Sequence, residues 1–308
     1  MAAQALVSIS MPAFNAAKYI ASSIQSVLDQ TYPNFELIIY DDGSSDNTRE
    51  IIQSFSDPRI KTIFADQNQG LIVARNAIAK QAQGKYIALL DCDDIAEPTR
   101  LEEQVAYLES GHCDLCGTAY WTINEQSGRT KKSKQKYSDA DLKALLTIGS
   151  PFCNPTVMGK AEIFKSLPYL QLNKHAEDYG FFVEAALKGW RFANLKNRLL
   201  TYRLHESQIS IVQGGPAREV FKKMQLHYLE GMNIGPDYCP RPMSFMDRLR
   251  YAMPMMKMLN QFIAGVSIMA NYEIYARFQF RGNGVLTPFT RLERLIVSAI
   301  ASLYGLLA

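Results

Sequence analysis

The chain has 308 residues, of which 47% are hydrophobic and 20% are charged, and its formal net charge at pH 7 is +3. This is the composition of an ordinary globular protein, and so small a net charge argues against nucleic-acid binding as its main function. The five cysteines stand at irregular spacing, which is typical of free thiols in a reducing compartment.

Strands and helices alternate along the first hundred residues. Short apolar runs predict strands at 6–11, 35–40, 60–64 and 86–90, and apolar residues at helical spacing predict helices at 16–30, 48–55 and 71–82. Glu97 and Pro98 predict the start of another helix, with the proline at its first position. The pair Cys113 and Cys116 predicts a buried strand rather than a zinc site, because no second pair or histidine cluster accompanies it.

Repeated βα units of this kind predict an α/β fold with a mostly parallel mixed sheet flanked by helices. Ligands of such sheets bind outside the carboxyl ends of the strands. Two acidic clusters, at residues 41–46 and 91–94, each follow a predicted strand directly. We therefore expect both clusters to lie at one crevice, which becomes the candidate ligand site.

Asp91, Asp93 and Asp94 bring three carboxylates together at the end of the strand predicted at 86–90. Carboxylates this close repel one another unless a cation or solvent relieves them. Oxygen ligands favour Mg²⁺ and Mn²⁺, and Mg²⁺ commonly combines one or two carboxylates with substrate phosphates. The cluster therefore predicts a metal site, and a solvated acidic turn before the next helix is the alternative.

Residues 7–110 resemble the nucleotide-sugar-binding half of the family 2 glycosyltransferases, which have the GT-A fold. The resemblance rests on VSISMPAFNAAKYIASSIQSVLDQTYPNFELIIYDDGSSDNT at 7–48, NQGLIVARNAIAKQAQGKYIALLDCDD at 68–94 and EPTRLEEQV at 97–105. It continues more thinly through 154–164, 176–195 and 202–210. It implies a GT-A catalytic domain at 1–215, with a nucleotide-sugar-binding half at 1–110 and an acceptor half at 111–215, followed by a helical C-terminal extension at 216–308.

The resemblance also assigns the residues that bind the sugar donor. The donor-binding positions of the family match Pro12, Ala13, Phe14, Asp42, Arg75, Asp91, Cys92 and Asp93. It implies that Asp42 accepts a hydrogen bond from the uracil edge, that Arg75 neutralises diphosphate charge and that Asp91 lies nearer the ribose. Helix capping is the alternative for Asp42, and a surface salt bridge is the alternative for Arg75.

Metal and catalytic residues follow from the same resemblance. Asp93 matches the metal ligand of the family, and His205 matches a position where some members contact the metal or the diphosphate; the implied ion is Mn²⁺ or Mg²⁺. Asp178, preceded by Glu177, matches the catalytic base of an inverting transfer. An ordinary acid at a helix N-terminus is the alternative for Asp178, and a structural histidine is the alternative for His205. Asn154 departs from the histidine that many relatives carry there, which leaves acceptor details open.

Basic residues gather at the C-terminal end. Residues 241–308 contain eight Lys/Arg and three Asp/Glu, a balance of 8 − 3 = +5, which leaves 3 − 5 = −2 for the first 240 residues. The uncharged stretch 295–308 is shorter than the roughly 20 residues that span a bilayer, so we predict an amphipathic helix on a membrane surface. A helical appendage packed on the catalytic domain or on a second subunit is the alternative. The basic run at 129–136 predicts a solvated loop, with a lid over phosphate or an anionic acceptor as the alternative.

The resemblance implies an inverting glycosyltransferase that moves a hexosyl or N-acetylhexosaminyl group from a nucleotide-diphosphate sugar, expected to be a UDP-sugar, to a hydroxyl of a glycan or lipid-linked acceptor. The expected setting is cell-surface polysaccharide or lipopolysaccharide synthesis in the cytoplasm, at the inner face of the cytoplasmic membrane. No nucleic-acid partner is expected, and oligomerisation is left open. A non-catalytic nucleotide-binding scaffold and a polysaccharide synthase are the alternatives, although the QxxRW run expected of a synthase does not occur.

Overall fold

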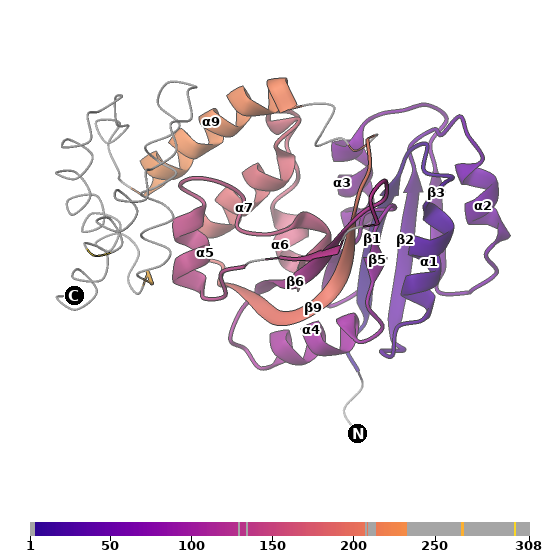
Figure 1. Cartoon of the computed structure of the whole chain (residues 1–308), viewed down its shortest axis with the longest axis horizontal. Helices are drawn as coiled ribbons and strands as arrows, with labels where there is room; N and C mark the ends of the chain where they lie inside the picture. The colour runs from indigo at the N-terminus through magenta and orange to yellow at the C-terminus, as the bar shows by residue number, and fades with distance from the viewer. Residues whose placement is uncertain are drawn as a thin grey trace.

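The computed structural model of the chain describes residues 4–128, 130–133, 135–206, 208, 214–232, 266–267 and 299 (Figure 1). Its strands are β1 Val7–Ala13, β2 Phe35–Asp41, β3 Ile60–Phe64, β4 Tyr86–Leu89, β5 Ile95–Ala96, β6 Leu115–Asn124, β7 Thr130–Lys132, β8 Met158–Lys160 and β9 Phe192–Leu204. Its helices are α1 Ile20–Leu28, α2 Thr48–Ser54, α3 Leu71–Gln81, α4 Arg100–Glu109, α5 Asp139–Leu145, α6 Ala161–Ser166, α7 Glu177–Leu187 and α9 Gly214–Gly231, with the 3-10 turns η1 Asn154–Thr156 and η2 Gln171–Asn173. The strands and helices predicted before β5 all occur, with ends displaced by a few residues.

The strands form one mixed sheet in the order β3-β2-β1-β4-β8-β6-β9-β5, and β7 pairs with β6. β1 pairs in parallel with β2 and β4, β2 with β3, and β6 with β9. β8 runs antiparallel to both β4 and β6 and so joins the two parallel parts. The expected α/β fold with a mostly parallel mixed sheet is therefore confirmed, and both predicted halves of the chain contribute to the same sheet.

Helices cover both faces of the sheet, which explains why the central strands read as continuous apolar runs. All seven residues of β2 are buried, and successive side chains enter opposite cores. Leu37 and Ile39 pack with residues of α1 and α4, whereas Ile38 and Tyr40 pack with residues of α3, α6 and α7. Figure 1 shows α1 and α2 beside β1–β3, and α5 and α7 farther from these strands, next to α9.

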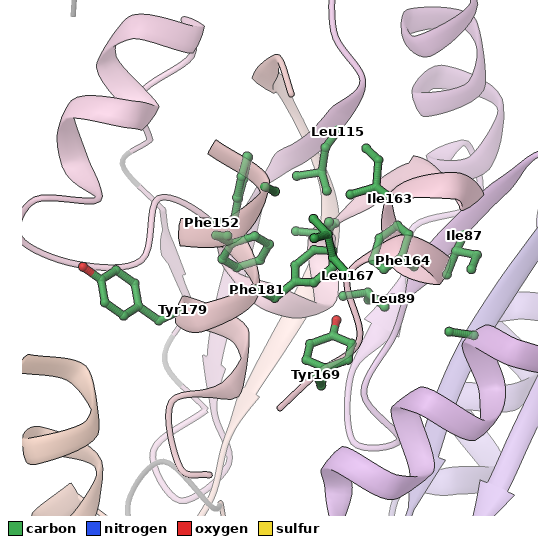
Figure 2. Close-up of a cluster of buried hydrophobic side chains, with 14 of the residues drawn as sticks. Ile87, Leu89, Leu115, Phe152, Ile163, Phe164, Leu167, Tyr169, Tyr179 and Phe181 are labelled. Carbon is green, nitrogen blue, oxygen red and sulfur yellow. The ribbon is translucent and has the colours of Figure 1, made fainter. Parts of the chain in front are cut away.

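An aromatic cluster fixes the start of α7 against the sheet (Figure 2). Phe181 stacks on Phe164 and on Tyr169 with ring centroids 5.0 Å apart in each case. Phe152 meets Phe182 edge to face at 5.0 Å. Each buried aromatic side chain contributes roughly 1.5–3 kcal/mol of hydrophobic stabilisation, so this cluster, which also contains Ile87 and Leu89 of β4, stabilises the packing of α7 on the sheet.

The predicted start of the helix at Pro98 is wrong, since α4 begins at Arg100 with Thr99 as its N-cap. The two residues of β5 pair with Thr201 and Leu200 of β9, and Glu97 N donates to Leu199 O at 3.1 Å. This pairing keeps the chain extended up to Glu97, so Pro98 falls in the turn before the helix. Tertiary pairing here overrides the local helix signal.

The buried strand predicted around Cys113 and Cys116 is confirmed. Both thiols are fully buried, and Cys116 belongs to β6. Part of the basic run at 129–136 forms the exposed strand β7, while residues 129 and 134 lie outside the described residues.

The helix α9 begins the predicted C-terminal extension and packs on α7. The Tyr179 and Phe221 rings stack at 4.0 Å, and the Tyr228 hydroxyl donates to Lys143 O at 3.0 Å. Ser267 donates through its backbone N–H and its hydroxyl to Asp141 of α5, at 2.6 and 2.7 Å. Of the segment 241–308, only residues 266, 267 and 299 are described, so the amphipathic helix predicted there otherwise lies outside the described residues. Among the helices that are described, none has the length and apolar character to cross a membrane.

Candidate active site

The loops that follow β1, β2 and β4 meet at the same edge of the sheet. The three strands are parallel, so their carboxyl ends point the same way. Backbone hydrogen bonds continue past the strand ends, from Asp42 N to Ala13 O at 2.9 Å and from Leu90 N to Ser10 O at 3.0 Å. Both acidic clusters therefore lie at one edge, as the chain order predicts.

Asp42 is buried and connects two of these loops. Its Oδ1 accepts the backbone N–H of Gln69 and its Oδ2 accepts that of Gly70, each at 2.8 Å. Both carboxylate oxygens of Asp42 therefore already accept hydrogen bonds from the segment before α3. Each oxygen has a second lone pair, which can accept a hydrogen bond from another donor. The structure gives Asp42 a role in loop architecture, and its contact with a uracil stays a prediction.

Asp41, the last residue of β2, organises the turn that follows. It is fully buried, and it accepts the Ser44 backbone N–H at 3.2 Å and the Arg49 Nε at 3.0 Å. Gly43 has a φ of 70°, and a Cβ there would lie 2.6 Å from the backbone carbon of Gln67. A larger residue would have to displace that backbone, so the turn is restricted to one conformation.

Pro12 and Ala13 end β1 in buried positions, and Phe14 follows with 47% of its surface exposed. The Phe14 backbone hydrogen-bonds the Cys92 sulfur, and Cys92 O accepts a hydrogen bond from Ser23 Oγ at 2.8 Å. Burial raises the pKa of the Cys92 thiol well above its ordinary value, and the neighbouring aspartates add to the rise, so the thiol stays neutral. The loop predicted to lie along the nucleotide therefore borders the acidic cluster and carries an exposed aromatic ring.

Arg75 is a buried cation between the two acidic parts of the site. Its side chain is 6% exposed, with Nη2 3.4 Å from Asp91 Oδ1 and Nη1 3.5 Å from Glu177 Oε1. Its guanidinium carbon lies 5.5 Å from the centre of the Tyr169 ring. Burial opposes the charge of Arg75, but the carboxylates around it raise its pKa, so it stays charged. The ion pairs of Arg75 are therefore buried rather than on the surface, and its contact with the diphosphate stays a prediction.

Two carboxylates beside Arg75 hold protons more tightly than usual. Burial raises the pKa of Asp91 to about 6 even though 32% of its side chain is exposed; Arg75 opposes this rise and Asp93 adds to it. Burial also raises the pKa of Asp178, with Glu177 adding to the rise and Arg75 opposing it. A carboxylate with a raised pKa is a better proton acceptor once it is ionised, which suits Asp178 to general base chemistry.

Asp93 and His205 lie together although they are far apart in the chain. His205 Nε2 is 2.9 Å from Asp93 Oδ2, and the two side chains are 9% and 23% exposed. The pair forms a hydrogen bond at this distance, and two neighbouring ligands of an octahedral ion, each about 2.1 Å from it, also stand about 3 Å apart, so a divalent cation could replace the shared proton. Within the described part of the chain no three acidic, histidine or cysteine side chains are grouped to hold an ion. The pair would therefore supply two ligands and leave the remaining positions to phosphate oxygens and water.

Sequence analysis placed Asp94 in the acidic cluster but missed Arg203 and Tyr19, which also lie beside this pair. Asp94 Oδ1 accepts the Arg203 backbone N–H at 3.0 Å, and burial raises the pKa of Asp94 well above its ordinary value. The Tyr19 ring lies against the His205 imidazole in a tilted arrangement, with ring centroids 4.6 Å apart. Side chains two positions apart in a strand lie on the same face. The sequence therefore already indicated that Arg203 and His205 share a face. No local pattern connects Tyr19 with either residue.

Comparison with known proteins identifies the family model "Glycosyl transferase family 2" over residues 8–167. An uncharacterized glycosyltransferase of Haemophilus influenzae is 35% identical over 247 residues, which cover 74% of this chain and 76% of that protein. The Escherichia coli UDP-Glc:alpha-D-GlcNAc-diphosphoundecaprenol beta-1,3-glucosyltransferase WfgD is 45% identical over 122 residues, which cover 40% of this chain and 48% of that protein.

Solved structures resemble the whole fold at low sequence identity. S. aureus TarS 1-349 in complex with UDP-GlcNAc superposes with a TM-score of 0.61 at 18% identity, covering 98% of this chain and 92% of that one. The mannosyltransferase PcManGT from Pyrobaculum calidifontis, in complex with GDP-Man and Mn²⁺, superposes with a TM-score of 0.53 at 14% identity, covering 99% and 88%. At these identities the similarity concerns the fold.

Proposed function

This chain belongs to glycosyl transferase family 2 and is a glycosyltransferase, and from that premise we propose that it is an inverting enzyme that uses a UDP-sugar. The proposed acceptor is a hydroxyl of a lipid-linked glycan in cell-surface polysaccharide synthesis. The E. coli relative named for UDP-Glc and a diphosphoundecaprenol acceptor supports both choices, as does the fold shared with a UDP-GlcNAc complex.

One observation carries the proposal, which is the position of Arg75 between the two acidic parts of the site. Its guanidinium contacts Asp91 on the donor side and Glu177, the neighbour of Asp178, on the other side. A buried cation there would neutralise charge on the diphosphate of the donor, whose anomeric carbon would then lie toward Asp178. The two contacts of Arg75 support a site in which the proposed donor residues and the proposed base act on the same bound sugar.

The proposed step is a displacement at the anomeric carbon. The acceptor oxygen forms a bond to that carbon while the bond from the carbon to the diphosphate oxygen breaks, and the electron pair leaves with the nucleoside diphosphate. Asp178 accepts the proton of the acceptor hydroxyl. Attack from the face opposite the leaving group inverts the anomeric configuration, as in inverting glycosidases that place a carboxylate base on that face.

The leaving group needs no protein acid if its charge is neutralised. Asp93 and His205 would hold Mn²⁺ or Mg²⁺, which stabilises negative charge on the departing diphosphate when it is bound. Arg75 adds a fixed positive charge from within the protein. Pro12, Ala13 and Phe14 lie at the end of β1 and directly after it, and they would contact the nucleotide. Asp42 would lie near the uracil base of that nucleotide.

A panel of nucleotide diphosphates tests the donor assignment. UDP, GDP, TDP, CDP and ADP would each be added with and without Mn²⁺, and the melting temperature recorded, because a ligand that binds only the folded state raises it. We expect the largest Mn²⁺-dependent rise with UDP. Asp93→Ala should lose the Mn²⁺-dependent part of that rise. A wild-type protein that melts unchanged with every nucleotide and metal would contradict the donor site.

A further inference from the structure

Tyr19 lies against the Asp93–His205 pair but is not among the residues proposed above to bind donor or metal. It stands directly before the first residue of α1. Its ring contacts the His205 imidazole in a tilted arrangement, with centroids 4.6 Å apart and planes inclined by 31°. Because the His205 side chain is only 9% exposed, the Tyr19 ring forms part of the wall that limits where the imidazole can turn.

Arg203 reaches the same place from β9. Its Nη1 donates to the backbone oxygen of Asp93 at 2.9 Å, and its Nη2 donates to Ser22 Oγ at 3.0 Å. Its guanidinium carbon lies 5.5 Å from the centre of the Tyr19 ring. The end of β9 and the start of α1 are thus joined across the backbone of Asp93.

Glu125 anchors the other end of the Tyr19 side chain. Glu125 Oε2 accepts the Tyr19 hydroxyl at 2.8 Å and the Lys18 ammonium at 2.8 Å. Glu125 itself follows β6, and its backbone N–H donates to Leu204 O at 3.3 Å. Tyr19 is therefore held at its hydroxyl by one element and at its ring face by another.

A metal-binding histidine that can adopt several orientations must lose that freedom when it binds the ion, which weakens the ion's affinity. An aromatic ring in contact with one side of the imidazole removes some of those orientations in advance. We propose that Tyr19 is a positioning residue, which holds His205 in the orientation that binds the divalent cation. The inference rests on the proposed metal role of Asp93 and His205.

The test measures Mn²⁺ affinity directly in the full-length protein. Mn²⁺ binding in the presence of UDP would be followed by electron paramagnetic resonance, and UDP binding would be followed by calorimetry with Mn²⁺ and with EDTA. Tyr19→Ala should weaken Mn²⁺ binding about tenfold and leave UDP binding in EDTA unchanged. Tyr19→Phe keeps the ring and should stay within about threefold of wild type. Tyr137→Ala, which removes a half-exposed tyrosine elsewhere on the surface, should match wild type.

Each contrary outcome has a distinct meaning. Normal Mn²⁺ affinity in Tyr19→Ala overturns the inference while the proposed function stands. An equal loss of UDP binding with Mn²⁺ and with EDTA also overturns it, because Tyr19 would then support the nucleotide or the fold rather than the histidine. Absence of UDP-dependent Mn²⁺ binding in the wild type overturns the proposed metal site itself, and the inference falls with it.

Discussion

Asp178 combines the features expected of a catalytic base in a single residue. It occupies the first turn of α7, and its Oδ1 accepts the Tyr179 backbone N–H at 2.7 Å. That hydrogen bond and the nearby Arg75 favour the ionised form, but burial and Glu177 outweigh them and raise the pKa of Asp178. An ordinary acid at a helix N-terminus would have a lowered pKa, so the raised value favours the catalytic interpretation.

Replacing the base should separate catalysis from binding. Asp178→Asn should lower the rate of transfer by about 10²–10⁴-fold, because proton acceptance is lost, while UDP binding by calorimetry should stay close to wild type. Near-normal transfer in this variant would rule out Asp178 as the base. The variant should also melt at or above the wild-type temperature. The pKa of Asp178 is higher in the folded state, so its ionisation near neutral pH disfavours folding, and the amide removes that charge.

The pH dependence of transfer follows from the same carboxylate. Asp178 must be ionised to accept a proton, so kcat/KM should fall as the pH drops through its pKa. Because that pKa is raised, the fall should begin at a higher pH than for an ordinary aspartate, whose pKa is about 3.9. A kcat/KM profile that stays flat down to pH 4 in a protein that remains folded would contradict the assignment.

Among the elements, β8 joins the two parallel parts of the sheet. The buried carboxylate of Asp114 connects β8 to the residues that precede β6 and β9. Asp114 precedes β6, and its side chain is 7% exposed. Its Oδ1 accepts Lys160 Nζ of β8 at 2.8 Å, and its Oδ2 accepts both the backbone N–H and the Nε of Arg191 at 3.0 Å. Desolvation opposes ionisation of Asp114, but these donors hold its pKa well below its ordinary value.

Neutralising this carboxylate should weaken the acceptor half. Asp114→Asn should lower the free energy of unfolding by about 1 kcal/mol, a modest value because both cationic partners are partly exposed. The pKa of Asp114 is lower in the folded state, so its stabilisation is complete above its unfolded pKa of about 3.9 and is lost as the pH falls toward the folded value. Urea unfolding at pH 7 and pH 3 should therefore show a difference between wild type and variant that shrinks at pH 3. A difference of the same size at both pH values would exclude this origin.

At the scale of the whole molecule, the sequence leaves two interpretations of the C-terminal extension. It is either a helix on a membrane surface or a helical appendage packed on the catalytic domain or on a second subunit. The contacts of α9 with α7, and of Ser267 with Asp141, show that parts of the extension pack on the catalytic domain. The basic balance of 241–308 is the basis for the membrane role, which stays a prediction.

Removing residues 241–308 should move the protein from the membrane fraction to the soluble fraction of a lysate, because the basic and apolar residues proposed to bind anionic lipid would be absent. UDP binding by the truncated protein serves as the control for an intact donor site. If the truncated protein binds UDP and its distribution between fractions is unchanged, the membrane role of this segment is wrong.

Much of the donor half could be predicted from sequence because its information is local. Apolar runs of strand length, helical periodicity and their alternation predict β1 to β4 and α1 to α3, and the acidic loops then fall at one edge of the sheet through chain order alone. Family resemblance supplied the residue roles, which no periodicity contains. Where a local signal competed with strand pairing, as at Pro98 before α4, the local signal failed.

The tertiary structure alone decided which distant side chains meet. Arg75 contacts Glu177 across 102 positions, and His205 contacts Asp93 across 112 positions. The second contact follows from the pairing of β5 with β9, which brings the residues before β5 beside the end of β9, and β8 joins the two parallel parts of the same sheet. Side-chain periodicity records which face of an element is buried, but it carries no record of which other element covers that face. For that reason the chain order by itself predicts that the two acidic loops share an edge, while the position of Arg75 between Asp91 and Glu177 and the contact of the Tyr19 ring with His205 are decided only by the tertiary structure.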